Sequence, residues 1–268
     1  MLIELDLRLA HEVRDDKRRV LRGEIEFLTQ EHRERWDAEL PDGVEAVARV
    51  HGFATKVSVA WEPEAPARIA EALAGRFVSR LRIRPGSAAE EADDEYWSDE
   101  PDFDEYDVPL PPPPHEADAL ADLDLGGIRE LDLSHFRFAD PGARHLAAAT
   151  STARVETLDL RYCGIGDDGM KALATSATFA HVRRLHLQHN RLTGEGVREL
   201  ARFERLGELD LRYNRIGADG ARALVEAPFA GSLRRLLAHR RDVSDAGVET
   251  LASAAGLPSA LRSFWRSV

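Results

Sequence analysis

Cysteine, lysine and long apolar runs are scarce in this chain of 268 residues. Cys163 is the single cysteine, which excludes an internal disulfide framework and a zinc cluster built on thiolates. Only three of the 36 basic residues are lysines, and this bias, together with abundant alanine, is typical of a GC-rich bacterial genome. No apolar run approaches the roughly 18 residues that a membrane-spanning helix needs, so no membrane association is expected.

The beginning of the chain also lacks the features of a secretory signal. A signal peptide has a basic tip followed by an apolar stretch, whereas residues 1–16 intersperse acids and arginines among the apolar residues. With its single cysteine, the chain is therefore expected in the cytoplasm.

Negative charge is concentrated in one segment. The formal net charge is −12, yet 13 acids and no Lys or Arg lie between Glu90 and Asp118, so the rest of the chain is close to neutral. The acidity therefore does not describe the whole surface. Because the same segment contains the run Pro111–Pro114 and few apolar residues, we expect residues 86–118 to form an acidic, proline-rich, disordered insertion.

A five-fold internal repeat determines the expected architecture. Short leucine-containing tripeptides recur at spacings of 27, 27, 24 and 27 residues, each with a glycine eleven positions and a leucine fifteen positions after its first leucine. The first leucines are Leu131, Leu158, Leu185, Leu209 and Leu236. The glycines are Gly142, Gly169, Gly196, Gly220 and Gly247.

This pattern resembles the leucine-rich repeat family, L-x-x-L-x-L-x-x-N/C-x-L, in the longer helix-bearing form known from the ribonuclease inhibitor. The asparagine position holds Asn190, Asn214 and Cys163, but Phe136 and Arg241 in the two outer copies. The resemblance implies that each repeat is a strand, a turn and a helix, and that the asparagine amide ties the turn together. We expect an α/β fold, namely a curved right-handed solenoid with a parallel concave sheet and convex helices.

The repeats predict where strands lie and which side chains are buried. Because strand side chains alternate, both leucines of each L-x-L should be buried. Weaker copies at Val57–Val59 and Leu81–Ile83, with a helix over 65–73 between them, predict divergent first repeats over 52–85, and the regular repeats should span 119–256. Strands are expected at residues 56–60, 80–84, 130–134, 157–161, 184–188, 208–212 and 235–238.

Both ends of a solenoid expose a core edge and need a cap. Apolar spacing predicts a helix from about residue 16 to 40, and we expect residues 1–51 to form an N-terminal helical cap and 257–268 a C-terminal cap. The stretches LRGEIEFLTQEHRERW and HGFATKVSVAW resemble the N-terminal repeat-companion region of certain myxobacterial and planctomycete proteins. A helix that precedes this region in those proteins is missing here, which leaves two alternatives: an incomplete cap, or a native start codon that lies upstream.

Few residues suggest catalysis. Gly164–Gly166 and Gly194–Gly196 imitate part of a dinucleotide fingerprint, but the repeat explains them as strand-to-helix turns. Cys163 occupies a buried repeat position, which argues against a nucleophile. Four histidines on or just after the strands are a possible metal set, but no carboxylate or thiol recurs at ligand spacing. These are His135, His186, His189 and His239. We therefore expect no catalytic residues, metal or cofactor, and a chain that is not an enzyme.

Outward-facing strand positions form three columns in which a binding surface is expected. The first contains Asp132, Asp159, His186, Asp210 and Leu237. The second contains Ser134, Arg161, Gln188, Arg212 and His239. The third, at the strand exit, contains His135, Tyr162, His189, Tyr213 and Arg240. Tyr and Arg are enriched in protein interfaces, although any solenoid must also cover its concave face with polar residues.

The favoured function is an interaction module that binds a protein or peptide partner on the concave face. The alternative is a GTPase-activating or other enzyme-regulating repeat protein, since the family includes eukaryotic GTPase activators; Arg161 or Arg212 would then be presented to a nucleotide on the partner. Nucleic-acid binding through the strip Arg80–Arg84 is not expected, because the acidic run begins six residues later.

The acidic segment supports a further hypothesis of autoinhibition. It directly follows the basic residues Arg80, Arg82 and Arg84, so a short tether holds it near them. It also carries four aromatic residues that a solvated spacer does not need, Tyr96, Trp97, Phe103 and Tyr106. Part of 94–107 would fold back over the N-terminal strands and compete with a partner; the alternative is an idle loop.

Overall fold

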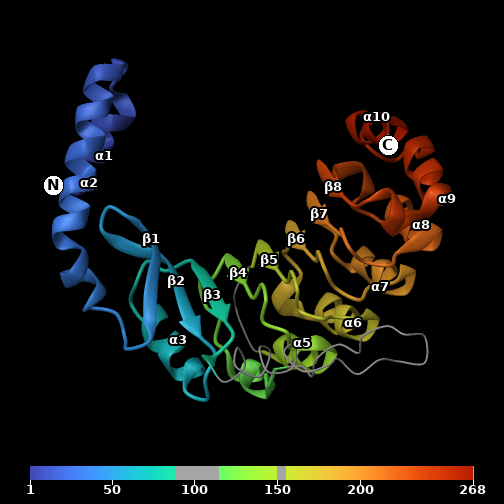
Figure 1. Ribbon diagram of the computed structural model, residues 1–268, viewed down its shortest axis with the longest axis horizontal. Helices are drawn as coiled ribbons and strands as arrows, with labels where there is room; N and C mark the ends of the chain where they lie inside the picture. Colours follow the sequence, from blue (N-terminus) through green and yellow to red (C-terminus); the bar gives the residue numbers. More distant parts are fainter. Residues whose placement is uncertain (88–114, 150–154, 268) are drawn as a thin grey trace, which may run out of the picture.

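The computed structural model describes residues 1–87, 115–149 and 155–267 (Figure 1). Its strands form an eight-stranded sheet in sequence order, in which β1 and β2 are antiparallel and all later neighbours are parallel. The strands are β1 (Val44–Val50), β2 (Phe53–Ala60), β3 (Arg80–Arg84), β4 (Glu130–Asp132), β5 (Thr157–Asp159), β6 (Arg184–His186), β7 (Glu208–Asp210) and β8 (Arg235–Leu237).

Helices alternate with these strands. They are α1 (Leu2–His11), α2 (Asp15–Asp37), α3 (Ala65–Leu73), α5 (Ala139–Ala148), α6 (Asp167–Thr175), α7 (Gly194–Glu199), α8 (Gly217–Glu226), α9 (Arg240–Ser253) and α10 (Ser259–Ser267). Short 3-10 turns precede β4, β6, β7 and β8, namely η1 (Asp118–Asp122), η2 (Ala177–Phe179), η3 (Leu200–Arg202) and η4 (Ala230–Ser232).

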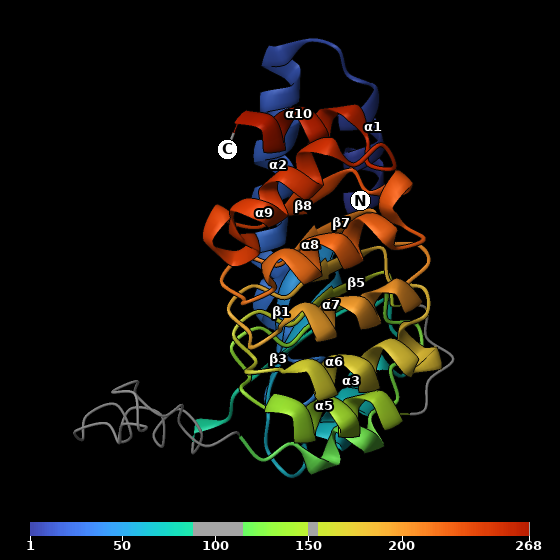
Figure 2. The same ribbon diagram turned by 90° about the vertical axis from the view of Figure 1, so that its right-hand side faces the viewer.

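The sheet lines the inner side of an arc, and α3 and α5 to α9 cover its outer side (Figure 1). From the outer side, α5 to α9 are stacked one above the next (Figure 2). This alternation of strands and helices around a mainly parallel sheet is the α/β solenoid that the repeats predict.

The predicted burial of the L-x-L leucines is confirmed, since each is at most 1% exposed. These are Leu131, Leu133, Leu158, Leu160, Leu185, Leu187, Leu209 and Leu211. Regular pairing in β4 to β8, however, ends one or two residues before the predicted strand ends. Backbone hydrogen bonds between repeats continue past these ends, for example from the N–H of His135 to the carbonyl oxygen of Arg161 at 2.8 Å. In three of these repeats they reach a residue with a positive φ, at which the chain changes direction.

Asparagines tie successive turns together as the repeat pattern implies. The amide nitrogen of Asn190 donates to the carbonyl oxygens of Leu160 and Leu187 at 2.7 and 3.0 Å, and its Oδ1 accepts from the N–H of Ile165 at 2.9 Å. Asn214 repeats this arrangement one repeat later. In the preceding repeat, the buried Sγ of Cys163 donates to the carbonyl oxygen of Leu133 at 3.1 Å.

The anchor glycines make room for aspartates that bridge neighbouring repeats. Asp140 Oδ1 accepts from the backbone N–H groups of Gly166 and Gly169, at 2.6 and 3.0 Å, and so caps the following helix. A Cβ at Gly169 would lie 2.5 Å from that oxygen, and one at Gly196 would lie 2.3 Å from the matching oxygen of Asp167. A side chain at either glycine would therefore displace the cap.

The last repeat replaces the asparagine with a different residue. Arg241, which holds the asparagine position, is exposed. Asp242 is 4% exposed, and its Oδ2 accepts from the N–H groups of His239 and Tyr213 at 2.7 and 3.1 Å. The aspartate therefore both caps α9 and ties the preceding turn.

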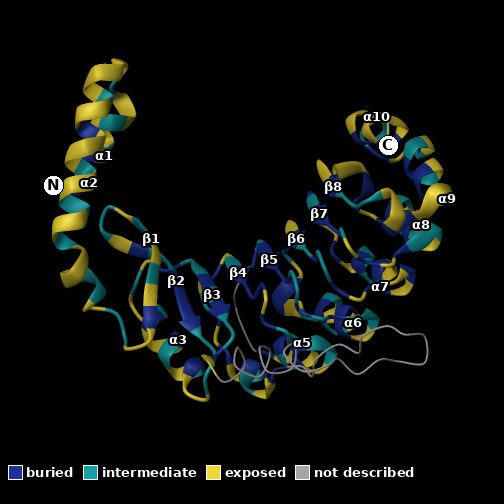
Figure 3. Ribbon diagram, viewed as in Figure 1, coloured by how far each residue is buried: buried dark blue, intermediate teal, exposed yellow. Residues whose placement is uncertain are grey.

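At the N-terminal end, α1 and α2 form a helical pair that extends away from the sheet and is largely exposed (Figure 3). α2 confirms the helix predicted from about residue 16 to 40, but α1 and strand β1, which lies within 1–51, were not among the predicted elements. His51 at the β1–β2 turn contacts Asp6 of α1 at 3.2 Å, and Arg49 pairs with Asp37 of α2. At the other end, Trp265 of α10 is 1% exposed.

None of the helices among the described residues is both long and apolar enough to span a membrane.

Candidate functional site

The first predicted column lies on the concave face but is less accessible than an outward-facing column suggests. Asp132, Asp159 and Asp210 are only 8%, 8% and 7% exposed. Neighbouring side chains cover these carboxylates, and each carboxylate accepts hydrogen bonds from the residue two positions later. Their role is therefore to hold their neighbours in place.

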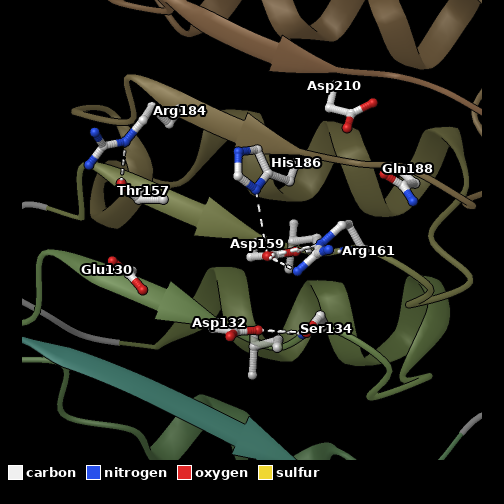
Figure 4. A network of polar contacts seen from close by, with 12 residues as sticks. Glu130, Asp132, Ser134, Thr157, Asp159, Arg161, Arg184, His186, Gln188 and Asp210 are labelled. Atoms are coloured by element: carbon white, nitrogen blue, oxygen red, sulfur yellow. Dashed lines mark hydrogen bonds and ion pairs between the residues drawn. The ribbon is translucent and has the colours of Figure 1, made fainter. Parts of the chain in front are cut away.

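Arg161 and Asp159 form a pair with two parallel hydrogen bonds (Figure 4). Arg161 Nε donates to Asp159 Oδ1 at 2.8 Å, its terminal nitrogen donates to Oδ2 at 2.7 Å, and His186 Nδ1 lies 3.5 Å from Oδ2. Burial by itself would raise the pKa of Asp159, but the hydrogen bonds from His186 and Arg161 outweigh it and lower this pKa to about 2. The hydrogen bond to Asp159 in turn raises the pKa of Arg161.

Arg212 repeats this geometry two strands later. It donates to both oxygens of Asp210, at 2.9 and 2.6 Å, and to Oε1 of Gln188 at 2.9 Å. The hydrogen bond to Asp210 raises the pKa of Arg212. Both guanidinium groups are thus fixed on the concave face before any partner arrives. Between them lies a concave pocket of about 240 Å³, lined in part by Arg161, Gln188 and Arg212.

The third column forms a continuous stack of rings, which we call the ring ladder. His135 stacks on Tyr162, Tyr162 on His189 and His189 on Tyr213, with centroid distances of 4.5, 4.2 and 3.9 Å and interplanar angles of 20° or less. His239 closes the ladder edge-on against Tyr213 at 4.7 Å. Because ring spacing follows the strand spacing, the parallel sheet itself brings these side chains together.

Four ladder residues have left-handed backbone geometry. The φ angles of His135, Tyr162, His189 and Tyr213 are 68°, 58°, 55° and 60°. Such a backbone suits glycine, and a bulky residue in it is strained by about 1–3 kcal/mol. Burial, with smaller contributions from nearby arginines, lowers the pKa values of His135 and His189, which favours the neutral imidazoles of a stack.

The C-terminal end of the ladder borders a shallow, open hollow of about 590 Å³ lined by Tyr213, His239, Arg240, Arg241, Ser244 and Asp245. The guanidinium of Arg241 lies over the Tyr213 ring, 4.9 Å from its centroid. The sequence pattern did not indicate Arg241, because it occupies the asparagine position of the repeat.

Comparison with known families agrees with this geometry. A family model described as Leucine Rich repeat matches residues 155–174, 180–201 and 206–225. These three segments, within residues 155–225, are leucine-rich repeats. No curated protein matches the chain. Leucine-rich repeats generally mediate protein–protein interaction.

Arg240, which was predicted to belong to the third column, is not part of the ring ladder. The tripeptide register assigned Arg240 to the third column and His239 to the second. In the structure the His239 ring ends the ladder, and Arg240 is the first residue of α9, with its Nε 2.8 Å from Asp245. Asp242 caps α9 at His239, so helical geometry begins at Arg240, the position at which the other four repeats have the ladder residue with a positive φ.

The N-terminal basic strand of the autoinhibition hypothesis already has partners. Arg84 pairs with Glu45 at 3.1 Å, and Arg80 donates to Thr55 Oγ1 at 2.9 Å. Arg82 lies 3.8 Å from Asp132, which Lys56 also approaches at 3.6 Å. The aromatic residues assigned to this contact, Tyr96, Trp97, Phe103 and Tyr106, lie outside the described residues.

The other chemical candidates have structural roles. Cys163 is fully buried, and burial raises the pKa of its thiol well above the ordinary value, so a thiolate nucleophile is disfavoured. Of the four candidate metal ligands, His135, His189 and His239 belong to the ladder. Within the described part of the chain, no group of three or more His, Cys, Asp or Glu side chains is arranged to hold a metal ion.

Proposed function

We propose that these leucine-rich repeats bind a protein or peptide partner on the concave face, with the ring ladder and the fixed guanidinium groups of Arg161 and Arg212 as the contact surface. One observation carries the proposal. Four consecutive repeats keep a bulky ring where the backbone favours glycine. Strain of about 1–3 kcal/mol at each of four residues is as large as, or larger than, the ~0.5–1.5 kcal/mol that each of the three stacked pairs contributes, so stacking by itself does not account for the rings.

The guanidinium groups support the same conclusion. A flexible arginine loses roughly 0.5–1.5 kcal/mol of rotamer freedom when a partner immobilises it. Asp159 and Asp210 already hold Arg161 and Arg212 in place, and both arginines remain about one-third exposed. Tyr and Arg side chains fixed in this way are typical of the residues that dominate binding energy in interfaces.

The GTPase-activating alternative is less well supported. An arginine that stabilises phosphoryl transfer must extend into the nucleotide site of the partner. Both candidate arginines are instead bound by carboxylates of their own repeats. A non-enzymatic binding role therefore fits the geometry better, and the cytoplasm stays the proposed location because the chain has a single cysteine.

The proposal includes the finer architecture expected from the sequence. It comprises a right-handed coil of the ribonuclease-inhibitor-like subtype, an N-terminal cap over 1–51 and a C-terminal cap over 257–268. The contact between His51 and Asp6 supports the N-terminal cap. The buried Trp265 in α10, which packs on α9, supports the C-terminal cap.

A triple substitution of Tyr162, Arg212 and Tyr213 by alanine tests the function. It should abolish retention of the partner that the wild-type protein captures from lysate, while the far-ultraviolet circular dichroism stays unchanged. The matched control replaces Arg144, Lys171 and Arg198, which are exposed on α5, α6 and α7, and should retain the partner. Loss of binding in the control, with binding preserved in the concave variant, would move the binding site to the helical side.

A further inference from the structure

Five exposed arginines lie where the chain enters β6, β7 and β8. They are Arg183, Arg184, Arg205, Arg234 and Arg235, and we call this group the amino rim. None of them forms an ion pair with another described residue. This absence contrasts with the middle of the concave face, where Arg161 and Arg212 are each neutralised by an aspartate.

The rim is neutralised in the preceding repeats. Backbone hydrogen bonds of 2.7 to 2.9 Å link one residue per repeat in the order Arg129, Glu156, Arg183, Gly207 and Arg234. Arg129 pairs with Glu156 at 2.9 Å, so the row begins as an alternation of base and acid. Gly207 stands where the next acid would continue it. The missing carboxylate leaves Arg183 and Arg234 on either side of a residue that has no side chain.

Gly207 also determines where the neighbouring guanidinium lies. A Cβ at this position would be 3.6 Å from both Nε and a terminal nitrogen of Arg234. The guanidinium of Arg234 thus folds over Gly207, toward the Arg183 side of the row. Because φ of Gly207 is not positive and these contacts are ordinary van der Waals distances, a side chain is tolerated here.

The rim is continuous with the concave face. Arg184 points along that face with its Nε 2.8 Å from Thr157 Oγ1 (Figure 4), and Arg235 lines the same concave pocket as Arg161 and Arg212. Glu208 lies between Arg184 and Arg235 in the strand register without an ion pair to either. With Glu204, it sets two carboxylates against five guanidinium groups.

We propose that the amino rim binds an acidic stretch of the protein partner, an inference that rests on the function proposed above. Arg183 and Arg234 are two strand spacings apart, roughly 10 Å, which an extended peptide covers in about three residues. Carboxylates three residues apart on a partner segment would therefore meet both arginines. Binding would place that segment along the row and the rest of the partner across the concave pocket.

A nucleic acid fits these observations less well. Single-stranded nucleic acids combine a basic groove with ring faces on which bases stack. The rim contains no aromatic side chain, and the ladder rings across the sheet are stacked on one another.

Two substitutions of one residue test the inference. Gly207→Glu places a carboxylate between Arg183 and Arg234, and Gly207→Gln adds a side chain of the same size without charge. The probes are a short fluorescein-labelled peptide of repeated Glu-Gly-Gly triplets, its Gln-Gly-Gly counterpart and a single-stranded DNA of equal charge. Fluorescence anisotropy on the full chain, at low and at moderate salt, measures binding.

Wild-type protein and Gly207→Gln should bind the acidic peptide alike, and Gly207→Glu should weaken binding about tenfold, with the gap closing as salt rises. Equal binding by the two variants would overturn the proposal, as would DNA binding tighter than the peptide or absence of peptide binding. The alanine variant of Tyr162, Arg212 and Tyr213 should still bind the acidic peptide. The two proposals are thereby tested separately. Peptide binding by the Gly207 variants tests the amino rim, and partner retention by the triple alanine variant tests binding on the concave face.

Discussion

The ring of His189 stacks on the ring of Tyr213 with 3.9 Å between their centroids, although both residues have left-handed backbone angles. Adjacent strands lie about 4.8 Å apart, so rings at equivalent positions come within stacking distance without any special loop. The stack depends on the solenoid for its spacing and on strained backbones for its direction. A surface of this kind is set before a partner binds, which reduces the entropy lost on association.

Because the ladder backbone is strained, we expect a glycine substitution in the ladder to be less destabilising than an alanine substitution. Tyr162 has φ of 58° and stacks on both His135 and His189. Tyr162→Ala loses both stacks and keeps the unfavourable backbone, whereas Tyr162→Gly loses the stacks and relieves the backbone. The glycine variant should be more stable than the alanine variant by about 1 kcal/mol, measured as the free energy of unfolding in urea. A glycine variant less stable than the alanine variant would show that this backbone is not strained.

The charge on Asp159 predicts a specific loss of stability in acid. Its pKa is lowered from 3.8 to about 2 in the folded chain, so the folded state binds its proton less readily than the unfolded state. The carboxylate therefore contributes stability above about pH 4, and this contribution is lost as the pH falls toward 2. Urea unfolding at several pH values should show a stability gap between the wild type and Asp159→Asn that narrows over this window. A gap of constant size from pH 5 to pH 2 would contradict the assigned pKa.

The central repeat predicts a large cavity effect. Leu185 is fully buried in β6 between the neighbouring leucines of β5 and β7. Leu185→Ala should lower the free energy of unfolding by about 2–5 kcal/mol, because the removed atoms leave a cavity. Arg144→Ala, on the exposed side of α5, serves as the control and should change this free energy by less than about 0.5 kcal/mol. A loss below about 1 kcal/mol for Leu185→Ala would mean that the packing around β6 is looser than described.

The periodicity of the sequence predicts those features of the fold that recur in every repeat. The spacing of Leu158, Leu185 and Leu209 predicts parallel strands with buried leucines. The turns tied by Asn190 and Asn214 are what the resemblance to leucine-rich repeats implies. The regular spacing of the anchor glycines is visible in the sequence, but the sequence does not show why glycine is needed at these positions. Only the structure shows that Gly169 leaves room for Asp140 of the preceding repeat, a contact across 29 residues.

The repeating element and its inward face can therefore be predicted from the residues alone, because burial of alternate side chains follows from strand geometry. The folded arrangement of the repeats determines how side chains from different repeats meet. It placed His239 rather than Arg240 at the end of the ladder, because Asp242 caps α9 at His239 and Arg240 is already helical. It also brought Arg183, Gly207 and Arg234 into one row without a carboxylate, because backbone hydrogen bonds between repeats, and not distance along the chain, determine which residues are neighbours.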